Sequence, residues 1–446
     1  MRAVVVLLAL ASAHIARAEP PKRAVPVYDG RAEEPTTFVD VARGVVRVVL
    51  FPVRIVVDYG VRWPIGKLIA AAEHSHGVRS GIRYLFLAPP SPTMSVYPIA
   101  FYDFGFQSSI GLRFLWTNGF LEPGSKFSLK LGTGGADWWR ADATVLAAVP
   151  QLGRFRTGFD AGLRRRPDQQ FFGVGPRTPY AARARYLQVR LGLTAFVGWP
   201  ELSLTAGSSA QYIGESHFDG RLSIDDQVAA GRIARLPAGY RELVVTRRFG
   251  VQIALDTRGT KDSPERDRNS SGARIDAIIE GVQDHEIGQW LHVDATVGAA
   301  LRLDRVGEHK LDLRMRVELV EPSTTTPDDT IPFLELASIG GSRDLRGFAS
   351  GRGRDLSAAA LMLDYQWPLA AWLDATLYLG AGNVFGRGLS GFSTGKLRGS
   401  IGMGLALAGL SPDRQLELWS AFGMEPFDSG SEATSFRLVF GYSHDY

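Results

Sequence analysis

Apolar and polar residues alternate along most of this chain. In residues 311–319, Leu311-Asp312-Leu313-Arg314-Met315-Arg316-Val317-Glu318-Leu319, every odd position is apolar and every even position is charged. Side chains of a β-strand point to opposite faces in turn, so a period of two predicts strands with one apolar and one polar face. The pattern recurs from about residue 95 onward. We predict strands near residues 95–104, 107–117, 124–133, 138–149, 153–166, 183–198, 200–211, 243–256, 272–283, 289–303, 309–320, 356–367, 374–384, 396–408, 414–424 and 433–442.

The length and number of these segments separate two interpretations. In a soluble sandwich the apolar faces would form the core, and strands of about five or six residues are usual. Many segments here run to about 10–13 residues, the length of a tilted membrane-spanning strand. Roughly sixteen strands is also an even number, as single-chain bacterial barrels require. We therefore predict an all-β transmembrane fold for residues 95–446, a roughly 16-stranded antiparallel outer-membrane β-barrel with apolar side chains toward lipid.

The connections between predicted strands alternate in length. Residues 198–201 and 304–309 are short and fall on the periplasmic side of the predicted barrel, whereas residues 212–242 and 321–355 are long and fall outside. Short periplasmic turns and longer outer loops are typical of such barrels. Residues 257–271 are an exception, because this polar loop falls on the periplasmic side.

The first 90 residues have a different character. Residues 1–18 have the basic start, the short apolar run and the Ala16-Arg17-Ala18 cleavage site of a signal peptide. Residues 19–36 are predicted to be flexible, and residues 37–90 to form a periplasmic amphipathic helical segment. This segment is expected to be a lid packed at the barrel mouth, an interfacial helix on the inner leaflet, or both.

Composition excludes several classes of site. The chain has no cysteine, so it has neither disulfides nor thiolate metal ligands. Its net charge of +4 is dispersed, which argues against nucleic acid as a partner. No nucleophile elbow occurs, and His74, His76, His285 and His292 do not converge as metal ligands. We expect no enzymatic activity, no metal and no cofactor.

Two further local patterns, a Gly-Arg repeat and a set of tryptophans, lead to structural predictions. Gly351-Arg352-Gly353-Arg354 is expected to be basic and flexible but not a phosphate loop, because no strand-to-helix context surrounds it. Tryptophans at predicted strand ends are expected to form interfacial aromatic girdles; they are Trp138, Trp139, Trp290, Trp367 and Trp372.

A Gly-rich stretch with an Arg-Gly-aromatic core lies between two predicted strands. It reads Gly340-Gly341-Ser342-Arg343-Asp344-Leu345-Arg346-Gly347-Phe348. In its place before the C-terminus, it resembles the inward-folded loop of the BamA/TamA-type bacterial surface-antigen superfamily. The resemblance implies that the loop enters the lumen and that Arg346 pairs with Asp364 and docks near Tyr378. The family's Phe-x-Asp-x-Gly strand corresponds here to Tyr378-Leu379-Gly380-Ala381-Gly382. Gly380 thus replaces an acid, which implies looser docking of the loop.

The resemblance extends over most of the predicted barrel. Phe171-Phe172-Gly173-Val174-Gly175 is similar to a turn that recurs in these barrels, and Phe436, Leu438, Phe440 and Tyr442 alternate like their C-terminal assembly signal. Family members with established insertase or secretion roles carry POTRA domains, which are βααβ modules. The roughly 75 residues before the first strand have a helical pattern instead, so the chain resembles a member without POTRA domains.

The resemblance implies insertion, assembly or transport of membrane proteins or lipids at the outer membrane of a Gram-negative bacterium. The alternative is a passive pore or a structural scaffold for a lipoprotein partner. The feature that separates them is the seam between the first and last strands, where Pro98, Phe436, Phe440 and Tyr442 lie, because an insertase needs a weakly paired seam. Pro98 cannot donate a ladder hydrogen bond, which favours a weak seam. Expected partners are outer-membrane lipids including lipopolysaccharide, the assembly machinery that inserts the barrel, and, as an open expectation, a periplasmic or lipoprotein partner.

Overall fold

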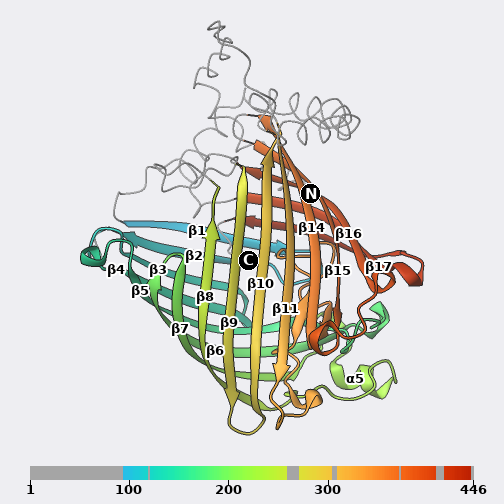
Figure 1. The fold of residues 1–446 in the computed structure, drawn as a ribbon. Helices are drawn as coiled ribbons and strands as arrows, with labels where there is room; N and C mark the ends of the chain where they lie inside the picture. The colour runs from blue at the N-terminus through green and yellow to red at the C-terminus, as the bar shows by residue number, and fades with distance from the viewer. Residues whose placement is uncertain are drawn as a thin grey trace, which may run out of the picture.

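A closed antiparallel barrel of sixteen strands forms the body of the protein (Figure 1). The computed structural model describes residues 94–118, 121–258, 271–303, 309–370, 373–407 and 416–442. Each barrel strand pairs with its neighbour in the chain, and β1 closes the ring against β18. The predicted fold class and strand number are confirmed. The predicted signal peptide, flexible stretch and helical segment within residues 1–90 lie outside the described residues.

The barrel strands are between 9 and 16 residues long. They are β1 (Met94–Asp103), β2 (Ser109–Thr117), β3 (Lys126–Gly135), β4 (Trp138–Ala148), β5 (Arg156–Phe171), β6 (Ala184–Trp199), β7 (Leu202–Glu215), β8 (Leu243–Asp256), β9 (Gly272–Asp284), β10 (Gly288–Arg302), β11 (Lys310–Pro322), β14 (Ser357–Ala370), β15 (Leu373–Phe385), β16 (Arg398–Leu407), β17 (Leu416–Pro426) and β18 (Ala433–Tyr442). Strands on opposite walls cross at a wide angle in Figure 1, as the tilt of barrel strands requires.

The connections hold the remaining elements. The β11–β14 connection contains a separate two-stranded sheet, β12 (Ala337–Ile339) and β13 (Gly353–Asp355), and the β7–β8 connection contains the helix α5 (Ile224–Ala229). Short 3-10 helices lie in these and in other connections: η3 (Pro150–Leu152), η4 (Tyr180–Ala182), η5 (Phe218–Gly220), η6 (Asp328–Thr330), η7 (Arg387–Leu389), η8 (Thr394–Lys396) and η9 (Phe427–Ser429). Among the described residues, no helix is both long enough and apolar enough to cross a membrane.

Several strands end later than predicted, among them β5, β7 and β14. We predicted that one strand ends at residue 166, but β5 continues to Phe171 through an irregularity in register between Arg166 and Gln169. The fully buried Asp168 holds this irregularity by accepting hydrogen bonds from Arg166 Nε at 2.7 Å and Gln107 N at 2.8 Å. Similarly, β14 runs to Ala370, so Asp364 lies in the middle of this strand and not near its end.

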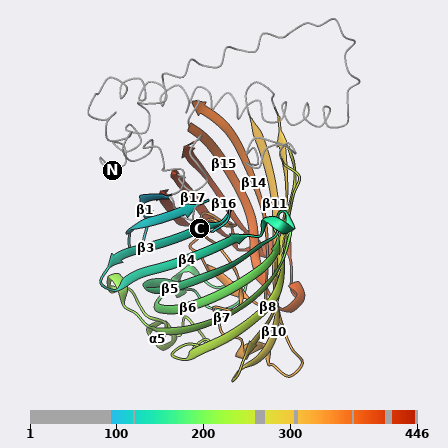
Figure 2. The ribbon, with the colours of Figure 1, turned by 90° about the vertical axis from the view of Figure 1, so that its left-hand side faces the viewer.

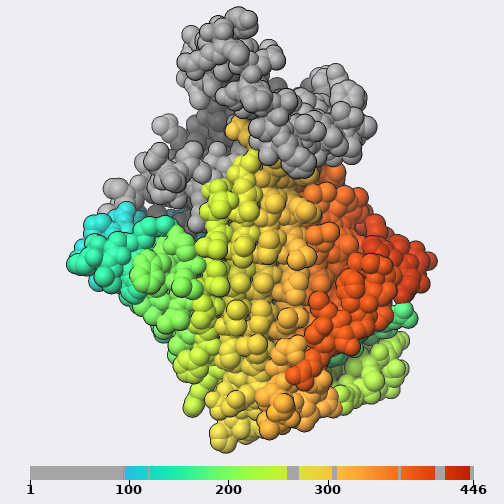
Figure 3. All heavy atoms as spheres, in the orientation of Figure 1, coloured from blue at the N-terminus to red at the C-terminus, as the bar shows by residue number. Residues whose placement is uncertain are grey.

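The two faces of the barrel wall have opposite polarity. On β11, Leu313 and Met315 are 45% and 50% exposed on the outer face, whereas Arg316 on the inner face is 4% exposed. Figure 3 shows β8–β11 packed into an unbroken outer wall. An apolar outer face around a charged interior is the polarity of a membrane-spanning barrel, because lipid chains cannot solvate charge.

The connections divide the barrel into two ends. We call the end where β1 begins and β18 finishes the terminal end, and the opposite one the loop end. The long β5–β6, β7–β8, β11–β14 and β15–β16 connections gather at the loop end, where α5 lies in Figure 2. Ser223 caps α5 through a capping box with Asp226, whose pKa is lowered by the hydrogen bond from the Ser223 backbone.

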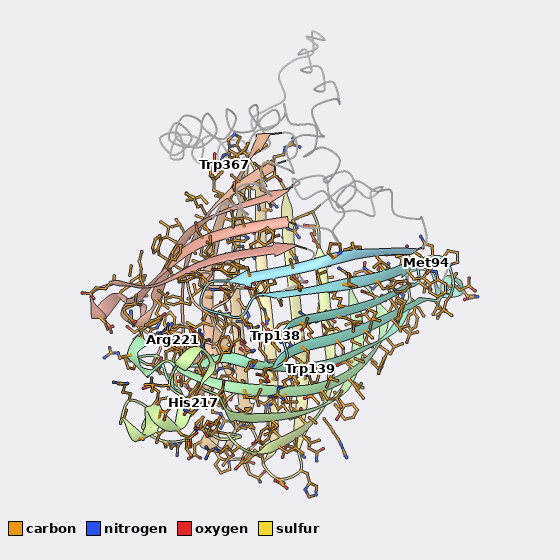
Figure 4. The ribbon with its side chains drawn as sticks, turned by 180° about the vertical axis from the view of Figure 1, so that it is seen from behind. Met94, Trp138, Trp139, His217, Arg221 and Trp367 are labelled. Atoms are coloured by element: carbon orange, nitrogen blue, oxygen red, sulfur yellow. The ribbon has the colours of Figure 1, made fainter. Side chains whose placement is uncertain are left out.

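Trp138 and Trp290 correct the expectation of interfacial girdles. Trp138 and Trp290 are buried because the alternation places them on the lumen face, and Trp367 is buried in a stack with Tyr365 at 5.4 Å between ring centroids. Figure 4 shows Trp138 and Trp139 near the centre of the barrel view, Trp367 at one end, and His217 and Arg221 beside α5 at the other. Trp372 lies outside the described residues.

An apolar core fills the lumen at the loop end. Phe333 packs between Phe171 and Tyr186, with ring centroids 4.7 and 5.3 Å apart, and all three residues are buried. Phe171 begins the Phe-Phe-Gly-Val-Gly turn that the sequence pointed out. This turn therefore anchors the β5–β6 connection to the β11–β14 connection, and it supports the inward loop described next.

Candidate functional site: inward loop and barrel seam

Residues 340–352 connect β12 to β13 and fold into the barrel; we call them the inward loop. Gly340 and Gly341 begin it with φ of +103° and +97°, a conformation that favours glycine. A Cβ on Gly340 would lie 2.1 Å from the carbonyl oxygen of Ala349, so no larger residue fits. Gly341 N donates to the Phe348 carbonyl at 2.8 Å and closes the loop.

Arg346 pairs with Asp364 inside the barrel, as the resemblance implied. Its two terminal nitrogens donate to the two carboxylate oxygens at 2.8 and 3.2 Å, a bidentate geometry. The guanidinium also lies 3.9 Å from the ring centroid of Trp419 and 4.7 Å from that of Tyr378. Arg346 therefore joins β14, β15 and β17; the contact with Trp419 was not predicted.

Gly347 packs the inward loop against β16, β17 and β18. Gly347 N donates to Ser400 Oγ at 2.9 Å, and Ser435 Oγ donates to the Gly347 carbonyl at 2.7 Å. A Cβ on Gly347 would lie 2.1 Å from the Phe422 carbonyl oxygen. This close approach explains why glycine follows Arg346, and it brings the loop onto β16, β17 and β18.

Gly380 makes room for Tyr378. A Cβ at Gly380 would lie 2.1 Å from the Tyr378 hydroxyl and 3.0 Å from Leu345. The hydroxyl donates to the Asp344 carbonyl at 2.5 Å, so Tyr378 holds the loop where the related motif has an acid. The predicted looser docking stays a prediction.

A buried ion cluster beneath the loop was missed by the sequence analysis. Arg316 donates to Asp294 Oδ1 at 3.0 Å, to Glu318 Oε2 at 2.6 Å and to Asp344 Oδ2 at 2.9 Å, and also to the Ser338 carbonyl. The alternation had placed Arg316 and Glu318 on the inner face, but it could not reveal that they meet a carboxylate of the loop.

Residues 351–354 were expected to be flexible, and the structure corrects this expectation. Arg352 and Arg354 are buried and bonded, not flexible. Arg352 donates to Oγ1 and to the carbonyl of Thr178, both at 2.9 Å, and its guanidinium lies 4.7 Å from the Phe172 ring centroid. Thr178 belongs to the β5–β6 connection, so these contacts come from a distant part of the chain.

The remaining candidates were the histidines considered as metal ligands, of which His74 and His76 lie outside the described residues. In the described part of the chain, no three His, Asp or Glu side chains are grouped as metal ligands. His292 lies instead 3.0 Å from Glu318 Oε1 as part of the charged lumen.

The seam joins β1 to β18. Among the described residues, which end at Tyr442, four residue pairs are in register, from Ala100↔Tyr442 to Asp103↔Val439. Pro98 lies opposite Leu112 of β2, and the weak pairing of the seam stays a prediction.

The seam aromatics occupy the outer side. Phe436 is 42% exposed, and its ring lies 6.2 Å from Phe104 across the seam and 5.0 Å from Phe422 on β17. Phe440 and Tyr442 are the register partners of Tyr102 and Ala100.

Arg437 joins the seam to the inward loop. From β18 it donates to both carboxylate oxygens of Asp103 on β1, at 3.2 and 2.7 Å. Its remaining terminal nitrogen donates to the carbonyls of Arg346 and Phe348, at 3.3 and 2.9 Å. A single buried guanidinium thus connects the first strand, the last strand and the loop; the sequence analysis did not identify Arg437 or Asp103.

A cavity of about 700 Å³ lies in the lumen beside the loop. Its lining mixes both signs of charge and includes Arg274, Asp276, Lys310, Asp312, Arg314 and Arg343. Arg314 pairs with Asp364 on the neighbouring strand at 2.5 Å, and Arg346 of the inward loop pairs with the same carboxylate. The inward loop is therefore linked to the wall, and the lining carries no single sign of charge.

Replacing Arg346 with alanine is expected to destabilise the barrel by about 2 kcal/mol, because a bidentate pair and a cation–π contact are lost together. The folded band on semi-native gels should unfold at a lower temperature. Arg274→Ala is the matched control, since its pair with Asp276 is largely exposed and such pairs contribute at most about 1 kcal/mol. Equal heat resistance of the Arg346 variant and wild type would contradict a docking role.

Comparisons with known proteins bear on the fold. No family model and no curated protein matches this chain. BamA from Haemophilus ducreyi lacking POTRA domains 1–3 is structurally similar, with a TM-score of 0.53 and 16% identity over 78% of this chain and 70% of that one. CdiB from Escherichia coli gives a TM-score of 0.49 and 13% identity, covering 79% of this chain and 63% of its own. CdiB from Acinetobacter baumannii gives 0.44 and 12%, covering 78% and 59%. The chain thus spans less than two thirds of either CdiB, and what the similarity to BamA shows is a shared outer-membrane barrel fold.

Proposed function

We propose that this protein is an outer-membrane barrel of the BamA/TamA type that inserts, assembles or transports membrane proteins or lipids by opening between β1 and β18. The observation that carries the proposal is the position of Arg437, which pairs with Asp103 across the seam and donates to the inward loop. The role is not enzymatic. The proposed location is the outer membrane of a Gram-negative bacterium.

We propose that the barrel opens at the seam, where the first and last strands meet. Each ladder hydrogen bond contributes about 0.5–1.5 kcal/mol in water, and an unpaired backbone group costs more in lipid. Opening therefore requires that the ladder of the seam and the Asp103–Arg437 pair be replaced by other contacts. A client that pairs with the freed strand edge would satisfy the exposed backbone groups, which is how strand addition generally works.

The passive pore and the scaffold remain the alternatives. The inward loop and its links to the wall argue against a steady pore, because Arg316, Arg346 and Arg437 each hold the loop in place. Outer-membrane lipids including lipopolysaccharide, the machinery that inserts this barrel, and a periplasmic or lipoprotein partner are the proposed partners.

A reversible lock across the seam tests the proposal. The chain has no cysteine, so an introduced pair forms a single defined disulfide. Phe101 and Gly441 are register partners on the inner side of the seam, and Phe101→Cys with Gly441→Cys would lock it. In the bacterium deprived of its own copy, we expect the oxidised variant to change the folded outer-membrane proteins or surface lipids as a deletion does. Reductant should restore the wild-type profile.

The matched control is Phe101→Cys with Ser109→Cys. These residues are also register partners, but the disulfide joins β1 to β2 and leaves the seam free. It should support the wild-type profile whether oxidised or reduced. A seam-locked protein that functions normally would contradict the proposal, and a large, steady, ohmic conductance in planar bilayers would favour the passive pore.

A further inference from the structure

Three arginines form a row across the inner wall, away from the inward loop. Arg140 on β4 is the register partner of Arg164 on β5, and Arg164 is the register partner of Arg190 on β6. Like charges directly opposite one another destabilise a sheet. Such a row therefore calls for a neutralising group.

The protein neutralises only one of the three. Arg140 donates to Asp142 on its own strand. Arg164 and Arg190 make no hydrogen bond or ion pair with any described residue. Asp142 attracts Arg164, and Glu335 and Glu280 attract Arg190, without a direct contact; these carboxylates already bind Arg140 or Arg248.

A hollow adjoins the row. Gly162 and Gly192 are register partners one step along the same inner face, and together they leave the wall without side chains. A Cβ on Gly192 would have no atom within 4 Å, whereas one on Gly162 would approach only Asp142 Oδ1, at 3.2 Å. The resulting cavity is about 350 Å³.

The other side of the hollow is lined with uncharged donors and a carboxylate. Thr144, Asp160 and Thr194 are register partners in the next row beyond the glycines, and Ser128 and Lys130 of β3 also line the hollow. The lining carries four basic and two acidic side chains. The site therefore offers an anion-binding side and a hydroxyl-binding side within one cavity.

We propose that this hollow binds the phosphate monoester of a sugar. The phosphate would lie between the Arg164 and Arg190 guanidinium groups, whose planar donors match phosphate oxygens. Hydroxyl groups of the sugar would bond to Asp160, Thr144 and Thr194. A cavity of this volume is within the usual range of small-ligand sites. The phosphate can belong to a free sugar phosphate or to the headgroup of a phosphorylated glycolipid.

Calorimetric titration of the folded full-length protein in detergent tests the site. Glucose 1-phosphate is expected to bind more tightly than inorganic phosphate, and glucose is expected to bind negligibly. Arg164→Gln with Arg190→Gln should weaken binding at least about tenfold, since two charge-assisted contacts are lost. Gly192→Leu should also weaken binding, because it fills the hollow without changing the charge.

Arg235→Gln is the matched control, because Arg235 pairs with Asp329 at the loop end and lies outside the hollow. Semi-native gels confirm that each variant is folded. Unchanged binding in the double arginine variant, or equal binding of inorganic phosphate, would overturn the sugar-phosphate site and leave only a solvated basic wall.

A second titration separates the two sources of the ligand. An alkyl glucoside 6-phosphate in mixed micelles keeps the phosphate as a monoester. It should bind more tightly than methyl glucoside 6-phosphate if the ligand is a lipid headgroup, and no more tightly if it is a free sugar phosphate. The hollow is lined by β3–β6, so a seam lock between β1 and β18 should leave this binding unchanged. The test of this site is therefore independent of the test of the proposed function.

Discussion

Replacing Arg316 with methionine should lower the free energy of unfolding by about 3–5 kcal/mol, because three buried carboxylates then lose the guanidinium that they share. Asp294, Glu318 and Asp344 all accept hydrogen bonds from this one guanidinium. Methionine keeps most of the volume of the side chain, so the loss reports charge and hydrogen bonding and not a cavity. Equilibrium urea unfolding in lipid vesicles, followed by tryptophan fluorescence, measures the difference.

Two further variants make this result specific. Arg235→Met removes an exposed pair with Asp329 and should cost less than about 1 kcal/mol. Adding Asp344→Asn to Arg316→Met should recover part of the loss, because one of the unpaired charges disappears. A loss below 1 kcal/mol in the single variant would show that the cluster does not anchor the β12–β13 sheet.

The strands could be predicted from the sequence because each has one face toward lipid and one toward the lumen. Because of this contrast, apolar and polar residues alternate with a period of two. The alternation predicted the faces of Arg316 and Met315 correctly. Strand ends were less predictable. The extension of β5 depends on contacts of Asp168 with Gln107, a residue of another strand connection.

The candidate site was predictable only where a local motif marks it. The glycines and Arg346 identified the inward loop, and the resemblance supplied its partner Asp364. No local motif identified Arg437, and the Gly-Arg-Gly-Arg pattern around Arg352 was interpreted as flexible. Alternation gives the face of a side chain, but the stagger between strands decides which side chains meet. Arg437 and Asp103 are 334 residues apart in sequence, and they meet only because the barrel closes.

Replacing Arg437 with alanine is expected to loosen the seam and the inward loop together. The change leaves the Asp103 carboxylate buried without its guanidinium, a loss on the order of 3–5 kcal/mol, and frees the carbonyls of Arg346 and Phe348. Hydrogen exchange followed by mass spectrometry should show faster exchange in peptides that cover β1, β18 and residues 340–352. Peptides from β8 and β9, on a wall away from the seam, serve as the internal reference.

Two variants separate the seam from the loop. Asp103→Asn weakens only the contact across the seam, so exchange should rise in β1 and β18 but not in the loop. Ser435→Ala removes only the hydrogen bond to the Gly347 carbonyl, so exchange should rise mainly in the loop. If Arg437→Ala reproduced just one of these patterns, the seam and loop would be held independently. If it reproduces both patterns, the same guanidinium holds the loop and the seam. A client or lipid that displaced the loop from Arg437 would then weaken the seam at the same time.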